Sequence, residues 1–144
     1  MDRSVTLSVS TAANEGAVQE LRQNLVEYNF SCAGPENYLP LSLILRDISS
    51  KLVAGLAGKI YYQWLFVELL WVSKDIRGHG HGRNLLSSAE DEARRQGCHQ
   101  VWLDTFSFQA PGFYQKNGYT LFGELSGYPP GHQRYFFRKM LAEV

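Results

Sequence analysis

Apolar and polar residues follow two rhythms along this chain, one typical of strands and one typical of helices. Alternating residues, or short apolar runs that end at turn residues, indicate strands. This pattern predicts strands at residues 4–11, 41–47, 52–63, 64–72, 99–106, 119–126 and 134–141. The run WLFVELLWV at residues 64–72 is nearly continuous, so we expect it to form a central strand that is buried on both faces.

Three segments between these strands have the three- and four-residue spacing of an amphipathic helix. They lie at residues 14–30, 80–96 and 109–117. Asn14 is in position to cap the first helix, and Gly97 is in position to end the second. In the first helix the apolar residues that recur at helical spacing are Val18, Leu21, Leu25 and Tyr28. In the second, one face is lined by Leu85, Leu86, Ala89 and Ala93.

The order of these elements, β-α-β-β-β-α-β-α-β-β, predicts an α/β fold with a mixed central β-sheet flanked by helices. A chain of 144 residues is long enough for one domain with a sizeable core and too short for two ordinary domains. We therefore expect a single domain over residues 1–144. Hydrophobic residues make up 44% of the chain and charged residues 19%, which is a globular composition and not a disordered one.

Charge and cysteine content argue against several classes of protein. Fourteen basic and fourteen acidic residues leave a formal net charge of zero, so electrostatics gives no case for binding nucleic acid or a membrane surface. Cys32 and Cys98 are far apart in the sequence, which argues against a disulfide scaffold and favours a reducing compartment. No apolar run has the pattern of a signal peptide or the length of a membrane span. We expect a cytoplasmic protein.

The stretch RGHGHGR at residues 77–83 comes directly before the second predicted helix and combines three glycines with two arginines. A helix N-terminus offers unpaired N–H groups, and glycine lets a ligand approach the backbone closely. Together with the arginine charges, these features indicate a binding site for a phosphate or pyrophosphate.

Three ligands are possible for this stretch: a nucleoside triphosphate, a dinucleotide and coenzyme A. A triphosphate loop should continue with Lys and then Ser or Thr, but Arg83 and Asn84 follow the last glycine; a dinucleotide loop should read GxGxxG directly after a strand. The alternative to all three is a flexible glycine turn without a ligand. A metal site at His79 and His81 has weaker support, because the chain has only two other histidines and no paired cysteines.

The segment ELLWVSKDIRGHGHGRNLLSSAEDEARRQG, residues 68–97, resembles the acetyl-CoA motif of the GNAT superfamily of N-acetyltransferases. Its hallmark, R/Q-x-x-G-x-G/A, is matched by Arg77, Gly80 and Gly82. A second hallmark is a short helix with A-x-x-F-Y before a glycine–aromatic pair. In FQAPGFYQKNGYTLFG it is matched by Ala110, Phe113, Tyr114, Gly118 and Tyr119. The resemblance covers essentially the whole chain and is specific in its second half.

The resemblance implies an enzyme that uses acetyl-CoA as a co-substrate. In such enzymes the strand before the glycine loop splays at a bulge and pairs with the pantetheine arm, which implies contacts from Leu70, Trp71 and Val72. Pyrophosphate binding is implied for the backbone of Arg77, Gly78, His79, Gly80, His81, Gly82 and Arg83. The family often has asparagine seven residues before the tyrosine of the F-Y pair. Here Ser107 stands at that position, and we expect it to contact the pantetheine arm.

Two residues are candidates for proton transfer. The resemblance implies that Tyr114 protonates the departing thiolate; the alternative is an aromatic packing residue. Glu68 is the only charged residue in the strand at 64–72, and burial there would raise the pKa of its carboxyl and suit it to act as a base. It could instead recruit a cationic substrate, or form an ion pair with a structural arginine.

The acceptor is the least readable part of the sequence. Tyr28 and Asn29 end the first predicted helix, where family members shape the acceptor pocket; packing and helix capping are the alternatives. Asp104 ends its strand and is either a substrate-binding carboxylate or a cap for the turn that follows.

We therefore expect acetyl transfer from acetyl-CoA to a primary amine by direct attack in a ternary complex. The amine belongs to a polyamine, an aminoglycoside-like antibiotic, an amino acid or a protein. The alternative is a non-catalytic acyl-CoA-binding or regulatory module on the same fold. No metal and no nucleic acid are expected, and only fold-level analogy supports a homodimer.

Overall fold

The computed structural model describes residues 4–142, which divide into two compact units with the boundary between Glu36 and Asn37. None of the helices within the described residues is long and apolar enough to cross a membrane.

The described part of the first unit, residues 4–36, contains one helix, α1 (Glu15–Ala33). The prediction of a strand at residues 4–11 is wrong. Residues 4–11 have no regular structure, and Val5, Leu7 and Val9 are exposed. Alternating apolar residues form a strand only where a neighbouring strand accepts their backbone hydrogen bonds, and these residues pair with no described strand.

Helix α1 itself confirms the helix predicted at residues 14–30 and extends it to Ala33. Asn14 stands at the N-cap, but its side chain makes no capping hydrogen bond. The helix ends at Ala33 and its C-cap is Gly34, so Asn29 lies inside the helix. The alternative that Asn29 caps the helix is therefore wrong.

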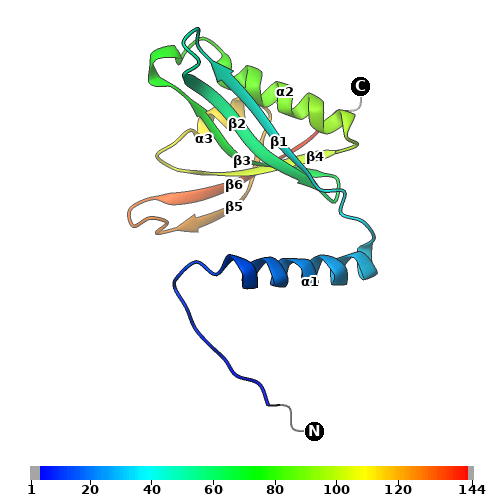
Figure 1. Cartoon of the computed structure of the whole chain (residues 1–144). Helices are drawn as coiled ribbons and strands as arrows, with labels where there is room; N and C mark the ends of the chain where they lie inside the picture. Colours follow the sequence, from blue (N-terminus) through cyan, green and yellow to red (C-terminus); the bar gives the residue numbers. More distant parts are fainter. Residues whose placement is uncertain (1–3, 143–144) are drawn as a thin grey trace. The chain divides into compact units, whose positions relative to one another are not determined.

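The second unit is a six-stranded sheet in the order β1-β2-β3-β4-β6-β5 (Figure 1). All neighbouring strands are antiparallel except β3 and β4, which are parallel, so the predicted mixed sheet is confirmed. The strands are β1 (Leu39–Arg46), β2 (Leu52–Tyr61), β3 (Trp64–Val72), β4 (Gln100–Phe106), β5 (Thr120–Ser126) and β6 (Gln133–Met140). The helices of this unit are a 3-10 turn, η1 (Lys74–Ile76), and two α-helices, α2 (His81–Arg95) and α3 (Pro111–Lys116).

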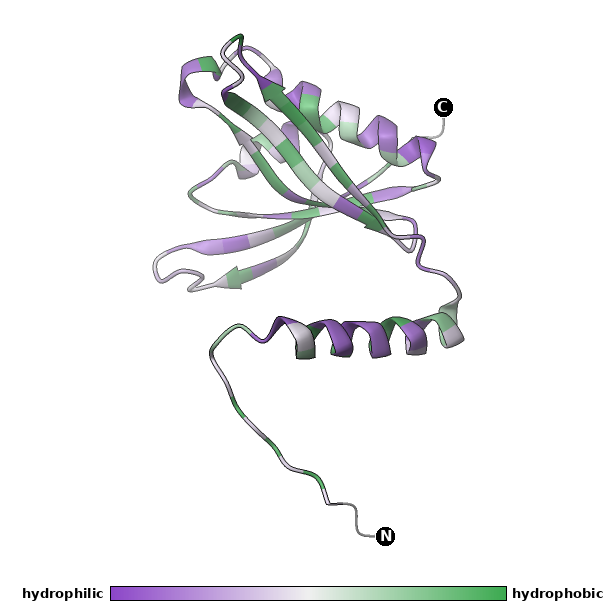
Figure 2. Ribbon diagram, in the orientation of Figure 1, coloured by the Kyte–Doolittle hydropathy of each residue, from purple (hydrophilic) through white to green (hydrophobic). Residues whose placement is uncertain are grey.

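The core of this unit lies between the sheet and α2, which packs against β1, β2 and β3. The predicted inner face of α2 is confirmed: Leu85, Leu86, Ala89 and Ala93 are all buried. In Figure 2 much of α2 is hydrophilic while the strands beneath it are largely hydrophobic, as expected for a helix with one buried stripe.

Strand β3 is not buried on both faces, as its sequence led us to expect. Leu65 and Val67 are buried, but Leu69 is 65% exposed and Trp71 is 50% exposed. The reason is that β3 pairs with β4 only from Trp64 to Val67. Beyond that point β3 stays with β2 while β4 stays with β6, so the two central strands diverge.

A β-bulge marks the point of divergence. Val67 pairs with Gly58 and Leu69 pairs with Ala57, so Glu68 is an extra residue without a partner in β2. Only glycine fits at position 58, because a Cβ there would lie 2.2 Å from the carbonyl oxygen of Phe66. The bulge that the family resemblance implies in this strand is therefore present.

Candidate active site

The diverging strands open a cleft of about 740 Å³ in the second unit. Its walls are the end of β3, the end of β4, the start of α2 and helix α3 with the turn before it. Eight of the predicted site residues line it: Glu68, Leu70, Trp71, Val72, Arg77, Gly82, Asp104 and Tyr114. The structure thus brings together residues that are up to 46 positions apart in the sequence.

The β3 side of the cleft is an open strand edge. After Val67 the backbone N–H and C=O groups that would pair with β4 have no strand partner there. An extended ligand arm that contains amides can bond to these groups as another strand would. Leu70, Trp71 and Val72, the residues predicted to bind the coenzyme A arm, are on this edge.

The glycine loop leads from β3 into the N-terminus of α2. Gly78 and Gly80 have φ of +81° and +82°, a left-handed conformation that glycine adopts without strain. Gly80 is the N-cap of α2, and the first N–H to bond back is that of Asn84, which donates to the Gly80 carbonyl. The N–H groups of residues 81–83 therefore lack helical acceptors and are available to an anion.

Two further contacts tie this loop to the cleft. Arg77 lines the cleft and donates from Nε to the carbonyl of Val72 at 2.9 Å, so its backbone and side chain hold the loop against β3. A Cβ at Gly82 would lie 3.4 Å from the ring of Phe113, so a small residue lets α2 begin close to α3.

The histidines of the loop form no metal centre within residues 4–142, where no group of three or more His, Cys, Asp or Glu side chains is placed to hold an ion. The rings of His79 and His81 lie 6.4 Å apart. Their predicted contribution to pyrophosphate binding through the backbone stays a prediction.

Tyr114 projects from the short helix α3 into the cleft and is only 8% exposed. Burial, and to a smaller extent the negative charge of Asp104, raises the pKa of Tyr114 to about 12. The hydroxyl therefore keeps its proton at neutral pH and can donate a hydrogen bond or a proton to a group bound in the cleft.

Asp104 is held by an arginine that the sequence analysis did not find. Arg134 of β6 donates to Oδ1 of Asp104 from Nε at 2.9 Å and from a terminal nitrogen at 2.7 Å. The prediction that Asp104 caps the turn after β4 is wrong. Gln109 caps this turn instead, because its Oε1 accepts a hydrogen bond from the N–H of Phe106 at 2.8 Å. The ion pair depends on the register between β4 and β6, which no local pattern predicts.

Glu68 is neither buried nor paired with an arginine, the two environments predicted for it. It is exposed at the bulge and lines the cleft, so the expected burial is wrong. The alternative of an ion pair with a structural arginine is also wrong, since no described cation lies within ion-pair distance of its carboxylate. The carboxylate is left facing the cleft, within reach of a bound cation.

Besides five loop residues (Gly78, His79, Gly80, His81 and Arg83), three predicted site residues lie outside the lining of the cleft. The Oγ of Ser107 accepts the N–H of Gln133 at 3.0 Å, which joins the end of β4 to β6; its contact with a coenzyme A arm stays a prediction. Tyr28 and Asn29 lie on α1 in the other unit, and their role in an acceptor pocket likewise stays a prediction.

Comparison with known proteins agrees with this geometry. The model of the acetyltransferase (GNAT) family matches residues 9–119. The chain is 45% identical over 92 residues to the blasticidin-S acetyltransferase of Streptomyces morookaense, which covers 63% of this chain and 68% of that protein. It is 32% identical over 131 residues to an acetyltransferase of Agrobacterium fabrum, covering 91% and 96%. The crystal structure of an acetyltransferase from Bacillus cereus superposes with a TM-score of 0.82 at 31% identity, covering 93% of this chain and 98% of that one.

Proposed function

Because this chain belongs to the acetyltransferase (GNAT) family, whose members transfer the acetyl group of acetyl-CoA, we propose that it acetylates a primary amine of a small antibiotic-like molecule. Transfer is direct, with acetyl-CoA and the amine bound together in the β3–β4 cleft. The observation that carries the proposal is the cleft itself, which joins an open strand edge, a glycine-capped helix N-terminus and a buried tyrosine hydroxyl.

The cleft fits coenzyme A in both of its parts. The open edge at Leu70–Val72 offers backbone donors and acceptors to the amides of the pantetheine arm, and the free N–H groups at the start of α2 face the place for a pyrophosphate. When bound, acetyl-CoA supplies an activated thioester carbonyl. The protein's part is to hold that carbonyl still beside the amine and beside Tyr114.

The two candidate catalytic groups come from different elements of the cleft lining. Glu68 on β3 accepts a proton from the substrate ammonium before attack, or from the amine nitrogen as its bond to the carbonyl carbon forms, directly or through water. Tyr114 on α3 donates to the sulfur as negative charge develops on it. Neither cysteine lines the cleft, since Cys32 is on α1 and Cys98 is buried before β4, so a covalent acetyl-enzyme is not part of the proposal.

The antibiotic class is proposed from the relative that shares 45% identity, which is named for blasticidin S. The proposal treats residues 1–144 as one acetyltransferase domain, because the family match at residues 9–119 crosses the boundary between the two units. A homodimer through the closing strands stays a prediction.

Release of free coenzyme A thiol with a panel of amines tests the proposal. We expect turnover with an antibiotic amine, such as blasticidin S or an aminoglycoside, that exceeds turnover with polyamines, amino acids and a peptide N-terminus. The N-acetylated form of the best amine should be inert, which controls for thioester hydrolysis. Thiol release that no amine increases would contradict amine transfer, and a preference for the peptide would contradict the antibiotic class.

Glu68→Gln distinguishes a base from a cation-recruiting carboxylate. Because Glu68 is exposed and water competes with it, we expect a loss in kcat/KM of no more than about 10²-fold, the low end for a positioned base. The acidic limb of the pH profile that belongs to the enzyme should disappear. The substrate amine also loses a proton, which gives the pH profile a limb of its own. That limb shifts when a less basic amine is used, whereas the limb from the enzyme stays in place, so measurements with two amines of different pKa distinguish them.

Glu124→Gln, which removes an exposed carboxylate on β5 that does not line the cleft, is the matched control and should leave the profile unchanged. If Glu68→Gln raises only the KM of the amine and the limb remains, Glu68 recruits a cation and is not the base.

A further inference from the structure

The buried face of α2 carries one charged residue that the reaction does not use. Glu90 is only 5% exposed, beside the apolar residues Leu86, Ala89 and Ala93 of the same face. A carboxylate in such a place is costly unless partners satisfy both of its oxygens. The sequence pattern predicts an apolar stripe here, so Glu90 interrupts it.

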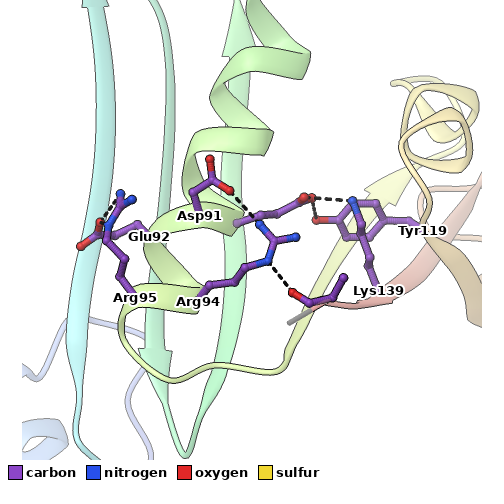
Figure 3. Close-up of polar contacts among 8 residues, drawn as sticks. Asp91, Glu92, Arg94, Arg95, Tyr119 and Lys139 are labelled. Atoms are coloured by element: carbon purple, nitrogen blue, oxygen red, sulfur yellow. Dashed lines mark hydrogen bonds and ion pairs between the residues drawn. The ribbon is translucent and has the colours of Figure 1, made fainter. Parts of the chain in front are cut away.

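Each oxygen of Glu90 has a partner from a different part of the second unit. The two partners, Tyr119 and Lys139, are labelled in Figure 3. Oε2 accepts a hydrogen bond from the hydroxyl of Tyr119 at 2.7 Å, and Oε1 accepts one from Nζ of Lys139 on β6 at 2.9 Å. Burial and the negative charge of Glu90 raise the pKa of Tyr119, so its hydroxyl stays a donor.

Tyr119 in turn holds Tyr114. Its N–H donates to the carbonyl of Tyr114 at 3.0 Å, and the two rings meet edge to face with centroids 6.0 Å apart. Helix α3 has only six residues, and a helix this short has little stability of its own. The position of the Tyr114 ring therefore depends on what surrounds α3, and Tyr119 contacts it through both backbone and ring.

We propose that Glu90 and Lys139 are positioning residues that fix Tyr119 and, through it, hold Tyr114 at a constant position relative to α2. The N-terminus of α2 is the proposed pyrophosphate site, and Glu90 lies nine residues along the same helix, about 14 Å at 1.5 Å per residue. One rigid helix thus sets the places of both the donor and the acid. The inference rests on the proposed role of Tyr114 as the acid.

Stability alone does not account for this cluster. Replacing a buried ion pair with apolar residues of similar size is often neutral or stabilising, so a helix that only needed packing could carry leucine at position 90. A fixed polar bond with defined direction instead restricts where the Tyr119 ring can lie. A positioning role and a purely stabilising role make different predictions for kinetics.

A double-mutant cycle between Tyr119→Phe and Tyr114→Phe separates the two roles. Tyr119→Phe keeps the ring and removes only the bond to Glu90. We expect kcat to fall roughly tenfold while the KM for acetyl-CoA changes little, since a displacement well under 1 Å costs less than the 10²-fold typical of a full 1 Å. In the Tyr114→Phe background the same change should lower kcat no further, because the hydroxyl to be positioned is gone.

Two other variants keep the result interpretable. Ile60→Val, a mild truncation of the β2 core away from α3, should lower the melting temperature without changing kcat. Glu90→Gln retains an oxygen that can accept the hydrogen bond of Tyr119, so its loss in kcat should be smaller than that of Tyr119→Phe. This loss should also disappear in the Tyr114→Phe background. If Tyr119→Phe does not fold, Glu90→Gln takes its place in the cycle. Equal losses in both backgrounds would overturn the positioning role while leaving the acid in place. A Tyr114→Phe variant with wild-type kcat would instead overturn the acid, and the inference with it.

Discussion

Tyr114→Phe should lower kcat by roughly 10²–10³-fold, the usual effect of losing one positioned donor to a developing negative charge. The loss should be the same in kcat and in kcat/KM, because the hydroxyl interacts mainly with the transition state. Acetyl-CoA should still bind, since the substitution keeps the ring and its packing against Phe113, Tyr119 and Phe137. Single-turnover kinetics and calorimetry measure the two quantities.

The raised pKa of Tyr114 adds a pH prediction. A free thiol has a pKa of about 8.5, so a phenol with a pKa of about 12 is the weaker acid and acts first by hydrogen bonding to the sulfur. Because burial and Asp104 both oppose the loss of its proton, the hydroxyl remains protonated below about pH 11. We expect no fall in kcat from Tyr114 ionisation up to that pH. A basic limb near pH 10 that disappears in Tyr114→Phe would contradict the raised pKa of Tyr114, while still identifying its hydroxyl as the group that acts on the sulfur.

Tyr135→Phe is the matched control for this variant. Tyr135 also packs against Phe137 but does not line the cleft, so loss of its hydroxyl should leave kcat unchanged. An acetyl donor with a more acidic thiol needs less help at the sulfur and should narrow the gap between Tyr114→Phe and wild type. Wild-type turnover by Tyr114→Phe under conditions where chemistry limits the rate would make Tyr114 a packing residue.

Gly80→Asp should abolish acetyl-CoA binding in the working range, with an affinity loss on the order of 10²-fold or more. The new carboxylate would stand at the N-cap of α2, beside the proposed pyrophosphate, where like charges cost several kcal/mol. It would also lie near Arg83, whose guanidinium is 3.8 Å from the position of a Cβ at residue 80, and neutralise a cation of the loop. Calorimetry with coenzyme A measures the change.

Gly80→Asn is the control that isolates charge from shape. Asn and Asp have nearly the same size, both tolerate positive φ, and both are good N-cap residues, so either variant should fold. We expect Gly80→Asn to bind coenzyme A much more tightly than Gly80→Asp. With acetyl-pantetheine, which has no pyrophosphate, the two variants should turn over alike. Equal affinities of the two variants for coenzyme A would refute the pyrophosphate assignment.

Local pattern predicted most of the secondary structure because each element follows from neighbours in the chain. The helical spacing of Leu85, Leu86, Ala89 and Ala93 predicted the buried face of α2 correctly, and the glycine loop predicted an anion site at its N-terminus. The prediction of a strand at residues 4–11 was wrong because it also rested on local pattern alone. Alternation shows that a segment is amphipathic, but a strand also needs a neighbouring strand to accept its hydrogen bonds.

The sequence by itself determined the family, the mixed α/β class and the donor, and it predicted Tyr114 as the acid, because these reside in short motifs whose spacing carries the chemistry. Only the tertiary structure decided the environments of the acidic groups. Glu68 is exposed at a bulge because Gly58 on another strand permits it, Asp104 is paired because the β4–β6 register brings Arg134 beside it, and Glu90 is buried because Tyr119 and Lys139 reach it from segments 29 and 49 residues away. Electrostatic environment depends on which distant segments meet, and that is a property of the packed chain.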